Sequence, residues 1–268
     1  MSSEWLLSHE PLLRLVPFIG VFALMAALEA WLPRRARGLP RIARWPSNLG
    51  IVAVDTVVVR VLFPTAAVGV ALAVEAQGGG LFGWLGAPFW LAVPLAVLLL
   101  DLAIYLQHVM FHAVPALWRF HQMHHADTDI DVTTGLRFHP IEIVLSMLVK
   151  FAAIAALGAP AAAVLLFEVL LNATSMFNHA NLRLPERVDA ALRRVLVTPD
   201  MHRVHHSVVE RETNSNFGFN LALWDRLFGT YRAQPEAGHD GMTIGVEQFR
   251  DPAEARLERM LTQPFRER

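Results

Sequence analysis

Eight of the twelve histidines in this 268-residue chain fall into three short groups whose spacing suits metal binding. One group is H-x3-H and the other two are H-x2-H-H, in which positions i, i+3 and i+4 share one face of a helix. Neutral imidazole binds iron, zinc and copper, whereas aligned imidazolium rings repel each other, so a cation explains why they are kept together. Eight imidazoles exceed what one ion can take, which predicts two metal ions. The groups are His108 and His112; His121, His124 and His125; and His202, His205 and His206.

Further side chains could complete such a centre. His179 ends an apolar stretch and is predicted to be a ligand. His139, which precedes a proline, is predicted to be a further ligand, or else a helix-capping residue or one that orients a ligand. A carboxylate orients a ligand histidine by accepting its second ring N–H. Asp101 is favoured for that role because it precedes His108 on the same segment. The acids available are Asp101, Asp127, Glu142, Asp200 and Asp225.

Several other chemistries are excluded. Because cysteine is absent, the chain has no disulfides, no thiolate zinc site and no cysteine-bound iron–sulfur cluster. It contains no pair of Glu-x-x-His motifs and no H-E-x-x-H. The net charge of -1 offers no overall field to attract nucleic acid, so no nucleic-acid partner is expected. His9 and His239 lie far from the three groups and are expected to take no part.

The elements that carry these histidines are expected to be membrane helices. Apolar residues make up 54% of the chain and charged residues 18%, with a mean hydropathy of +0.38. The predicted fold is an all-α integral membrane bundle with three spans, a helical hairpin that enters and leaves on the same side, and a histidine-rich di-metal cap. The first ten residues lack the features of a signal peptide. The spans are expected at 11–32, 48–76 and 88–107, and the hairpin at 141–178 with its turn at 158–160.

The side on which the cap lies follows from charge and from the metal requirement. A cluster of arginines after the first span indicates the cytoplasmic side. An even number of crossings between His125 and His202 keeps all histidine groups on that side, whereas an odd number would separate them by a bilayer of about 30 Å. Asp55 and Arg60, inside the second span, are expected to face neighbouring helices and to pair. Residues 77–87 are expected to form a flexible outer connection. The arginines are Arg34, Arg35, Arg37, Arg41 and Arg44.

Six segments together resemble the fatty acid hydroxylase/sterol desaturase superfamily of membrane di-iron oxygenases. They are LLLDLAIYLQHVMFH, LWRFHQMHH, LRFHPIE, NHANLRLP, TPDMHRVHHS and NSNFGFNLALWDRLFGTY, and they span about residues 95–232. The resemblance implies an N-terminal transmembrane region (1–94), a catalytic domain (95–232) and a C-terminal cytoplasmic tail (233–268). Where some members carry an additional histidine, this chain has Ser175, so either His139 supplies a ligand or one metal has an open position. The resemblance carries over as ligands His108, His112, His121, His124, His125, His179, His202, His205 and His206.

The expected function is that of a membrane-bound non-haem di-iron monooxygenase that hydroxylates or desaturates a lipid from the bilayer. Electrons are expected from a separate reductase, ferredoxin, cytochrome or pterin. The protein is expected in the cell inner membrane, with its two irons facing the cytoplasm, and zinc is expected to replace iron in purified protein. A zinc-dependent membrane hydrolase and, less favoured, a metal transporter remain as alternatives. The candidate aromatic residues of a substrate pocket are Phe111, Trp118, Phe138, Phe177, Phe217 and Trp224.

Overall fold

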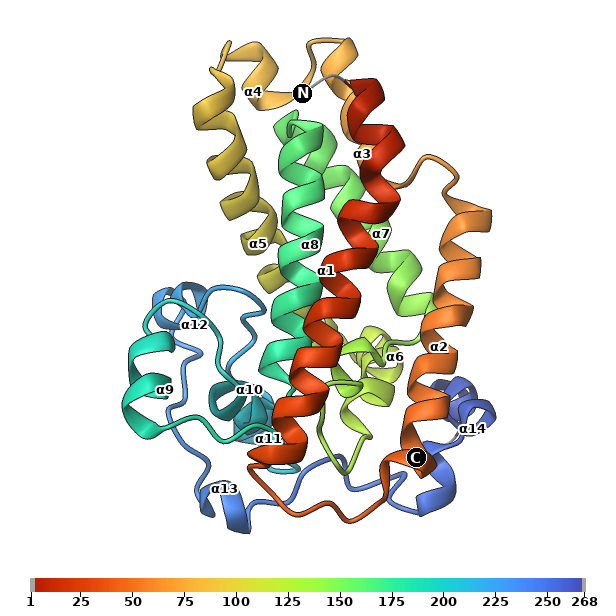
Figure 1. The fold of residues 1–268 in the computed structure, drawn as a ribbon, viewed down its shortest axis with the longest axis vertical. Helices are drawn as coiled ribbons and strands as arrows, with labels where there is room; N and C mark the ends of the chain where they lie inside the picture. The colour runs from red at the N-terminus through yellow and green to blue at the C-terminus, as the bar shows by residue number, and fades with distance from the viewer. Residues whose placement is uncertain (1–2, 267–268) are drawn as a thin grey trace.

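The structure, a computed structural model that describes residues 3–266, consists of upright helices with a cap of short helices and loops at one end (Figure 1). Within this range the only β-pairing is three isolated bridges. The prediction of an all-helical membrane bundle with a histidine-rich cap is confirmed. The helices of the bundle are α1 (Ser3–Trp31), α2 (Arg41–Leu62), α3 (Ala66–Ala76), α4 (Gly80–Trp84), α5 (Phe89–Ala113), α7 (Pro140–Leu157) and α8 (Ala161–Asn178).

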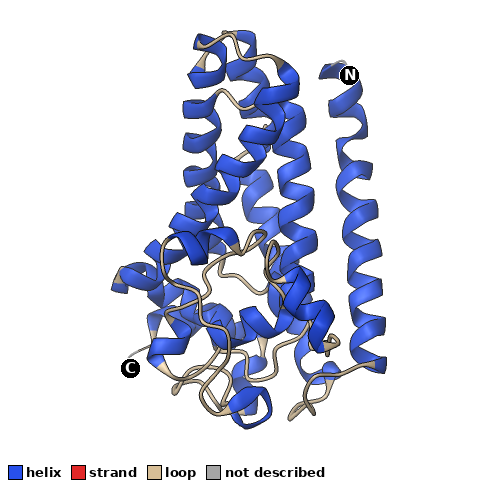
Figure 2. Ribbon diagram, turned by 90° about the vertical axis from the view of Figure 1, so that its left-hand side faces the viewer, coloured by secondary structure: helices blue, strands red, loops and turns tan. Residues whose placement is uncertain are grey.

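Five segments are long and apolar enough to cross a membrane. In the centre of the bundle α8 packs against α5, α3 and α1, and α7 packs against α2, α3 and α5. Helix α1 stands to one side of the other helices (Figure 2) and contacts the bundle mainly through α8. Large apolar side chains on α1, such as Leu12, Val16 and Ile19, are exposed, as expected of a surface that faces lipid.

The second predicted span is interrupted. Helix α2 ends at Leu62, and α3 begins at Ala66 after a turn that contains Pro64. A proline lacks the N–H that a helix needs and disfavours the helical conformation of the residue before it, so Pro64 accounts for the break. The sequence analysis treated 48–76 as one span and did not take this signal into account.

The connection between α3 and α5 is packed against the hairpin, which corrects the prediction of a flexible loop at 77–87. Gly80, at a φ of +75°, begins α4 and lies against the turn between α7 and α8. A Cβ atom on Gly80 would lie 2.1 Å from the backbone nitrogen of Gly158. Gly158 itself ends α7 in the left-handed conformation, with φ 63° and ψ 44°, and Pro160 precedes α8. The predicted hairpin turn at 158–160 therefore forms, with a glycine-to-glycine contact closing it.

The cap lies at the end of the bundle where α1, α5 and α8 finish and α2 and α7 begin (Figure 1). It is joined to α2 through Arg44, which is fully buried and pairs with Asp127 at 2.6 Å and Asp131 at 2.7 Å. Arg44 therefore serves packing inside the cap and is not an exposed charge of the loop. The cap elements are α6 (Pro115–His125), η1 (Thr134–Leu136), α9 (Glu186–Leu192), α10 (Pro199–His205), α11 (Glu210–Thr213), α12 (Leu223–Leu227), α13 (Gly238–Gly241), η2 (Pro252–Ala255), α14 (Leu257–Thr262) and η3 (Gln263–Phe265).

The C-terminal segment, expected to be a tail, is part of this cap. Helix α14 packs against α2, and η3 packs against α6. Met260 of α14 is fully buried with Ile51 and Met123. The backbone oxygen of Pro264 accepts a hydrogen bond from Arg119 of α6 at 2.9 Å.

Candidate metal centre

Nine histidines form two groups, and within each group one ring nitrogen per residue lies within 4.8 Å of those of the other members. Helix α5 supplies two of them from its last turns, α6 supplies three, α10 and the residue that follows it supply three, and His179 follows the end of α8. The first group is His108, His112, His121, His125 and His205, and the second is His124, His179, His202 and His206.

Each H-x2-H-H motif divides between the two groups. In α6, His121 and His125 belong to the first group and His124 to the second. In α10 the division is reversed, with His202 and His206 in the second group and His205 in the first. The sequence predicted one shared face for each motif but not that its i+3 position would reach a different group from i and i+4.

Short helix starts fix these side chains. Helix α6 begins with Pro115 directly after α5, so the chain turns back and brings His121 opposite His108. Helix α10 begins after Thr198, whose hydroxyl accepts a hydrogen bond from the N–H of Met201, and Pro199 occupies its first turn. Gly135 of η1 lies against the end of α8: a Cβ there would be 2.6 Å from the carbonyl oxygen of Ser175 and 3.1 Å from Nδ1 of His179.

The outer ring nitrogens of six histidines hydrogen-bond to acceptors. Four Nδ1 atoms donate to backbone carbonyls: those of His108 to Phe217, His124 to Arg137, His179 to Ser175 and His205 to Ser215, at 2.7, 3.1, 2.7 and 2.7 Å. Nδ1 of His121 donates to the carboxylate of Glu142 at 2.6 Å, and Nδ1 of His112 lies 3.3 Å from the amide oxygen of Asn214. A carbonyl oxygen only accepts, so these contacts fix the tautomer and direct Nε2 inward.

The inward nitrogens then face one another. Nε2 of His108 lies 3.0 Å from Nε2 of His205, and Nε2 of His124 lies 3.1 Å from Nε2 of His179. All four rings already donate through Nδ1, so in the neutral state each pair places lone pair against lone pair. Such an arrangement is unfavourable unless a cation binds between the nitrogens.

Burial opposes the alternative of protonating these rings. It lowers the pKa of His121 to about 3 and that of His179 to about 4. Burial, with repulsion from neighbouring histidines as a smaller cause, lowers the pKa of His206 well below its usual value. Both ring nitrogens of His206 are buried without a hydrogen-bond partner among the described residues, and a bound ion would satisfy one of them. The donor set therefore fits metal ions at both groups.

Of the acids that the sequence offered, Glu142 and not the favoured Asp101 contacts a clustered histidine. Glu142, which lies two residues after the start of α7, is the acid that contacts a histidine of the groups. Asp101, the favoured candidate, instead accepts hydrogen bonds from the Trp224 indole at 2.9 Å and from the N–H of Leu221. It lies two turns from His108 along α5, where the segment around α12 approaches.

The other acids stabilise the cap. Asp225 accepts hydrogen bonds from the N–H groups of Phe217 and Gly218. It thereby fixes the backbone segment in which the carbonyl oxygen of Phe217 accepts from His108. Asp200 pairs with Arg203 and Arg34, and burial by itself would raise its pKa but these cations lower it. Asp127 pairs with Arg44, as described above.

His139 lies outside both groups. Its Nδ1 accepts the N–H of Ile141 and caps α7, and its Nε2 lies 3.3 Å from the carbonyl oxygen of Leu261. The sequence analysis had left open whether His139 supplies a ligand in place of a histidine at position 175. The structure does not bring His139 to either group. His9 and His239 also lie outside the groups.

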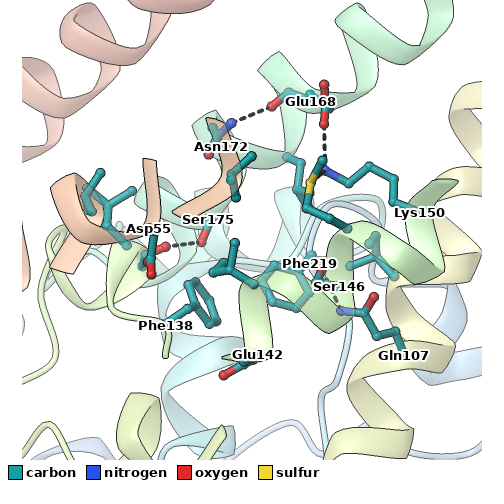
Figure 3. A pocket seen from close by; sticks show the side chains of 18 of the residues that line it. Asp55, Gln107, Phe138, Glu142, Ser146, Lys150, Glu168, Asn172, Ser175 and Phe219 are labelled. Atoms are coloured by element: carbon teal, nitrogen blue, oxygen red, sulfur yellow. Dashed lines mark hydrogen bonds and ion pairs between the residues drawn. The ribbon is translucent and has the colours of Figure 1, made fainter. Parts of the chain in front are cut away.

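A cavity of about 410 Å³ lies between α1, α2, α5, α7 and α8 (Figure 3). Its end nearest the cap reaches the first histidine group. His108 and His121 line this end, together with Phe111, Phe138 and Phe219. Phe111 and Phe138 were predicted as pocket residues, whereas Phe219 was missed. Trp118 and Phe217 pack instead on the histidine rings. Trp224 binds Asp101, and Phe177 of α8 packs against the apolar cluster that includes Met25 of α1.

Asp55 and Arg60 both line this cavity, but no ion pair joins them among the described residues. Oδ1 of Asp55 is buried without a hydrogen-bond partner. The two side chains are five residues apart on one helix, which is not one of the i, i+3 or i, i+4 spacings at which side chains are neighbours, and the predicted pairing does not form.

Comparison with known proteins points in one direction. The family model described as Fatty acid hydroxylase matches residues 93–230. Ornithine lipid hydroxylase OlsE of Rhizobium tropici is 31% identical over 148 residues, which are 55% of this chain and 44% of that protein. Alkylglycerol monooxygenase of Homo sapiens is 30% identical over 161 residues, 58% of this chain and 34% of that protein. Fatty acid hydroxylase vlmA of Lecanicillium sp is 31% identical over 164 residues, 53% of this chain and 42% of that protein. The chain thus spans less than half the length of these relatives, and no solved structure matches it.

Proposed function

The chain belongs to the fatty acid hydroxylase family, and we propose that it is a membrane-bound non-haem di-iron monooxygenase that hydroxylates or desaturates a lipid. One observation carries the proposal: a cavity among membrane helices ends at His108 and His121. Both belong to the first histidine group, in which the Nε2 lone pairs point towards one another. The names of the relatives, lipid hydroxylases and monooxygenases, support an oxidoreductase that acts on lipids.

The residues of the chain have distinct parts in this activity. The carbonyl acceptors and Glu142 hold the ligand rings in the tautomer that presents Nε2. The aromatic side chains at the end of the cavity, Phe138 and Phe219 among them, pack against hydrocarbon and keep water away from the reacting carbon. Iron bound at the two groups supplies the redox chemistry with O2 that allows an unactivated C–H bond to be oxidised.

We further propose that this centre faces the cytoplasm across the cell inner membrane and takes electrons from a separate reductase, ferredoxin, cytochrome or pterin. Arginines of the loop between α1 and α2 support the orientation. Arg34 and Arg35 bind Asp200, Asp240 and backbone oxygens of the cap, so the arginine-rich loop and the histidine groups lie at the same end.

Isotope labelling tests the function directly. Cells that express the protein are grown under 18O2, and their lipids are compared with those of cells carrying an empty vector. We expect a lipid with one added oxygen atom derived from 18O2, or a new double bond, and we expect its loss in His124→Ala. His9→Gln is the matched control, since His9 lies outside both groups.

Metal analysis separates this function from the hydrolase. Iron at two per chain in the active preparation, with product lost on chelation and restored by Fe2+, is the expected result. Activity that persists without O2 in protein containing zinc alone would overturn the proposal and favour a zinc-dependent hydrolase.

A further inference from the structure

The cavity has a second polar end, distant from the histidines. Lys150 of α7 and Glu168 of α8 lie together there (Figure 3). Arg14 of α1 pairs with the same Glu168, and Arg60, in the last turn of α2 and away from the cap, also lines the cavity. All four lie within segments long and apolar enough to cross a membrane. Ionisable side chains are costly in that setting and usually mark a functional site.

Charge at this end is not balanced. Glu168 accepts hydrogen bonds from both Arg14 and Lys150, each at 2.6 Å. These two cations of the cavity lining therefore share one carboxylate of the lining. Glu10 also pairs with Arg14 but does not line the cavity. Arg60 has no ion pair or hydrogen bond with any described residue. The other two carboxylates of the lining, Asp55 and Glu142, lie towards the histidines, so the lining at the far end has three cations and one carboxylate. With Glu10 counted as well, one cation is still unbalanced.

The separation of the two ends follows from the helices. Lys150 is eight residues beyond Glu142 on α7, or about 12 Å along the axis, and Glu142 contacts His121. Glu168 is eleven residues before His179 on α8, or about 16 Å along the axis. The lining between the ends is mainly apolar and includes Ile143, Met147 and Leu171.

We infer that this far end is an anion-binding subsite, and that a lipid binds with its carboxylate or phosphate at Arg14, Arg60 and Lys150 and its hydrocarbon directed to the histidine groups. The inference rests on the proposed function and adds an orientation to it. A volume of about 410 Å³ suits one chain more than a complete two-chain lipid. Thr56 and Arg60 are exposed, so the subsite is reached from the lipid side of α2. Oxidation is then directed to a chain carbon about 12 to 16 Å from the anionic group and not to the carbons next to that group.

Binding to the metal-loaded protein in nanodiscs of zwitterionic lipid tests the subsite without turnover. The probes are hexadecanoate, hexadecyl phosphate and the uncharged hexadecanol. We expect both anions to bind more tightly than the alcohol, and Arg60→Gln to weaken anion binding about tenfold, as for one charged hydrogen bond, while leaving the alcohol unchanged. Arg60→Lys should retain most of the preference. Arg187→Gln is the control, because Arg187 is an exposed arginine of α9 that does not line the cavity. A preference for only one of the two anions identifies which group the subsite accepts.

Photolabelling tests the orientation. A hexadecanoate with a diazirine at its methyl end should label the segments that carry Phe138 and Phe219, whereas a diazirine next to the carboxylate should label α1, α2 or α7 near Arg14, Arg60 and Lys150. Equal binding of anion and alcohol, no effect of Arg60→Gln, or the reversed labelling pattern would overturn the subsite. Those outcomes leave the 18O2 result intact, and a failed 18O2 experiment leaves the binding preference intact, so the two proposals fail separately.

Discussion

The contact between Glu142 and His121 gives the sharpest test of the metal centre. Among the nine clustered histidines, His121 is the one whose Nδ1 donates to a carboxylate, at 2.6 Å, and both residues are buried. Such a partner fixes the ring and raises the basicity of Nε2. Its loss from a metal site usually lowers affinity by about 10- to 100-fold, which corresponds to about 1.4 to 2.8 kcal/mol.

Two variants separate the contribution of the negative charge of Glu142 from that of its acceptor oxygen. Glu142→Gln keeps an oxygen acceptor for the N–H of His121 but removes the charge, so its metal affinity should fall towards the lower limit of that range. Glu142→Leu removes the acceptor as well and leaves Nδ1 of His121 buried without a partner, so its affinity should fall towards the upper limit. Asp101→Asn is the matched control: Asp101 is equally buried, but it contacts Trp224 and none of the histidines.

The assay is anaerobic competition for Fe2+ between the purified protein and a chelator of known affinity, with metal content measured in parallel. Thermal unfolding of the metal-free variants reports on the fold independently. If Glu142→Leu binds Fe2+ as tightly as Asp101→Asn, the carboxylate does not support the ligand, and the assignment of Glu142 is wrong.

Three further outcomes are expected. The metal-free protein should lose stability as the pH falls below about 6.5, by up to about 1.4 kcal/mol per pH unit per histidine. The unfolded chain takes up protons in this range, whereas burial lowers the pKa of His179 to about 4 and that of His121 to about 3 in the folded chain. Chemical denaturation between pH 7.5 and 5 measures this loss, and a free energy of unfolding that does not change with pH would contradict it. Gly80→Ala should destabilise the fold by about 2 kcal/mol more than Gly86→Ala. Both glycines have a positive φ, but only a Cβ at Gly80 would collide with the backbone of Gly158. Equal melting temperatures of the two variants would show that the turn rearranges to accept the Cβ. Arg44→Met should cost about 3–5 kcal/mol by leaving buried carboxylates unpaired, and adding Asp127→Asn should recover part of the loss in the same unfolding assay.

The spacing of the histidines was sufficient to predict a helical, metal-binding cap, because i, i+3 and i+4 relations are local properties of one helix. Which acid supports a ligand was not predictable in the same way. Asp101 lies seven residues before His108, close to the same face of α5, and so the sequence favoured it. Two turns, however, are about 10 Å along the axis, and at that height Trp224 approaches from the cap. Glu142 reaches His121 only because α7 starts beside α6, which is a matter of tertiary packing.

The membrane region shows the same limit. Hydropathy predicts apolar segments, and it succeeded for α1, α5 and the α7–α8 hairpin. It does not register a proline turn inside an apolar run, so the break at Pro64 was missed, nor does it distinguish an exposed arginine from one such as Arg44 that is buried against two aspartates. Hydropathy also gives no direction to a charged side chain within a span, and Arg60 and Asp55 face the cavity without pairing.

The divided motifs explain why two H-x2-H-H groups occur in one chain. On a helix, positions i and i+4 differ by about 40° in direction, whereas i+3 lies on the other side of i by about 60°. One motif can therefore place two rings at one centre and a third at a neighbouring centre. Helix α6 gives two rings to the first group and one to the second, and α10 gives one to the first and two to the second. Each helix alone would leave one centre with a single ligand, and only the opposed pair supplies three to both. His108 and His112 from α5 and His179 after α8 then add to opposite groups, so the two centres depend on the same two helices and should be lost together when either helix is displaced.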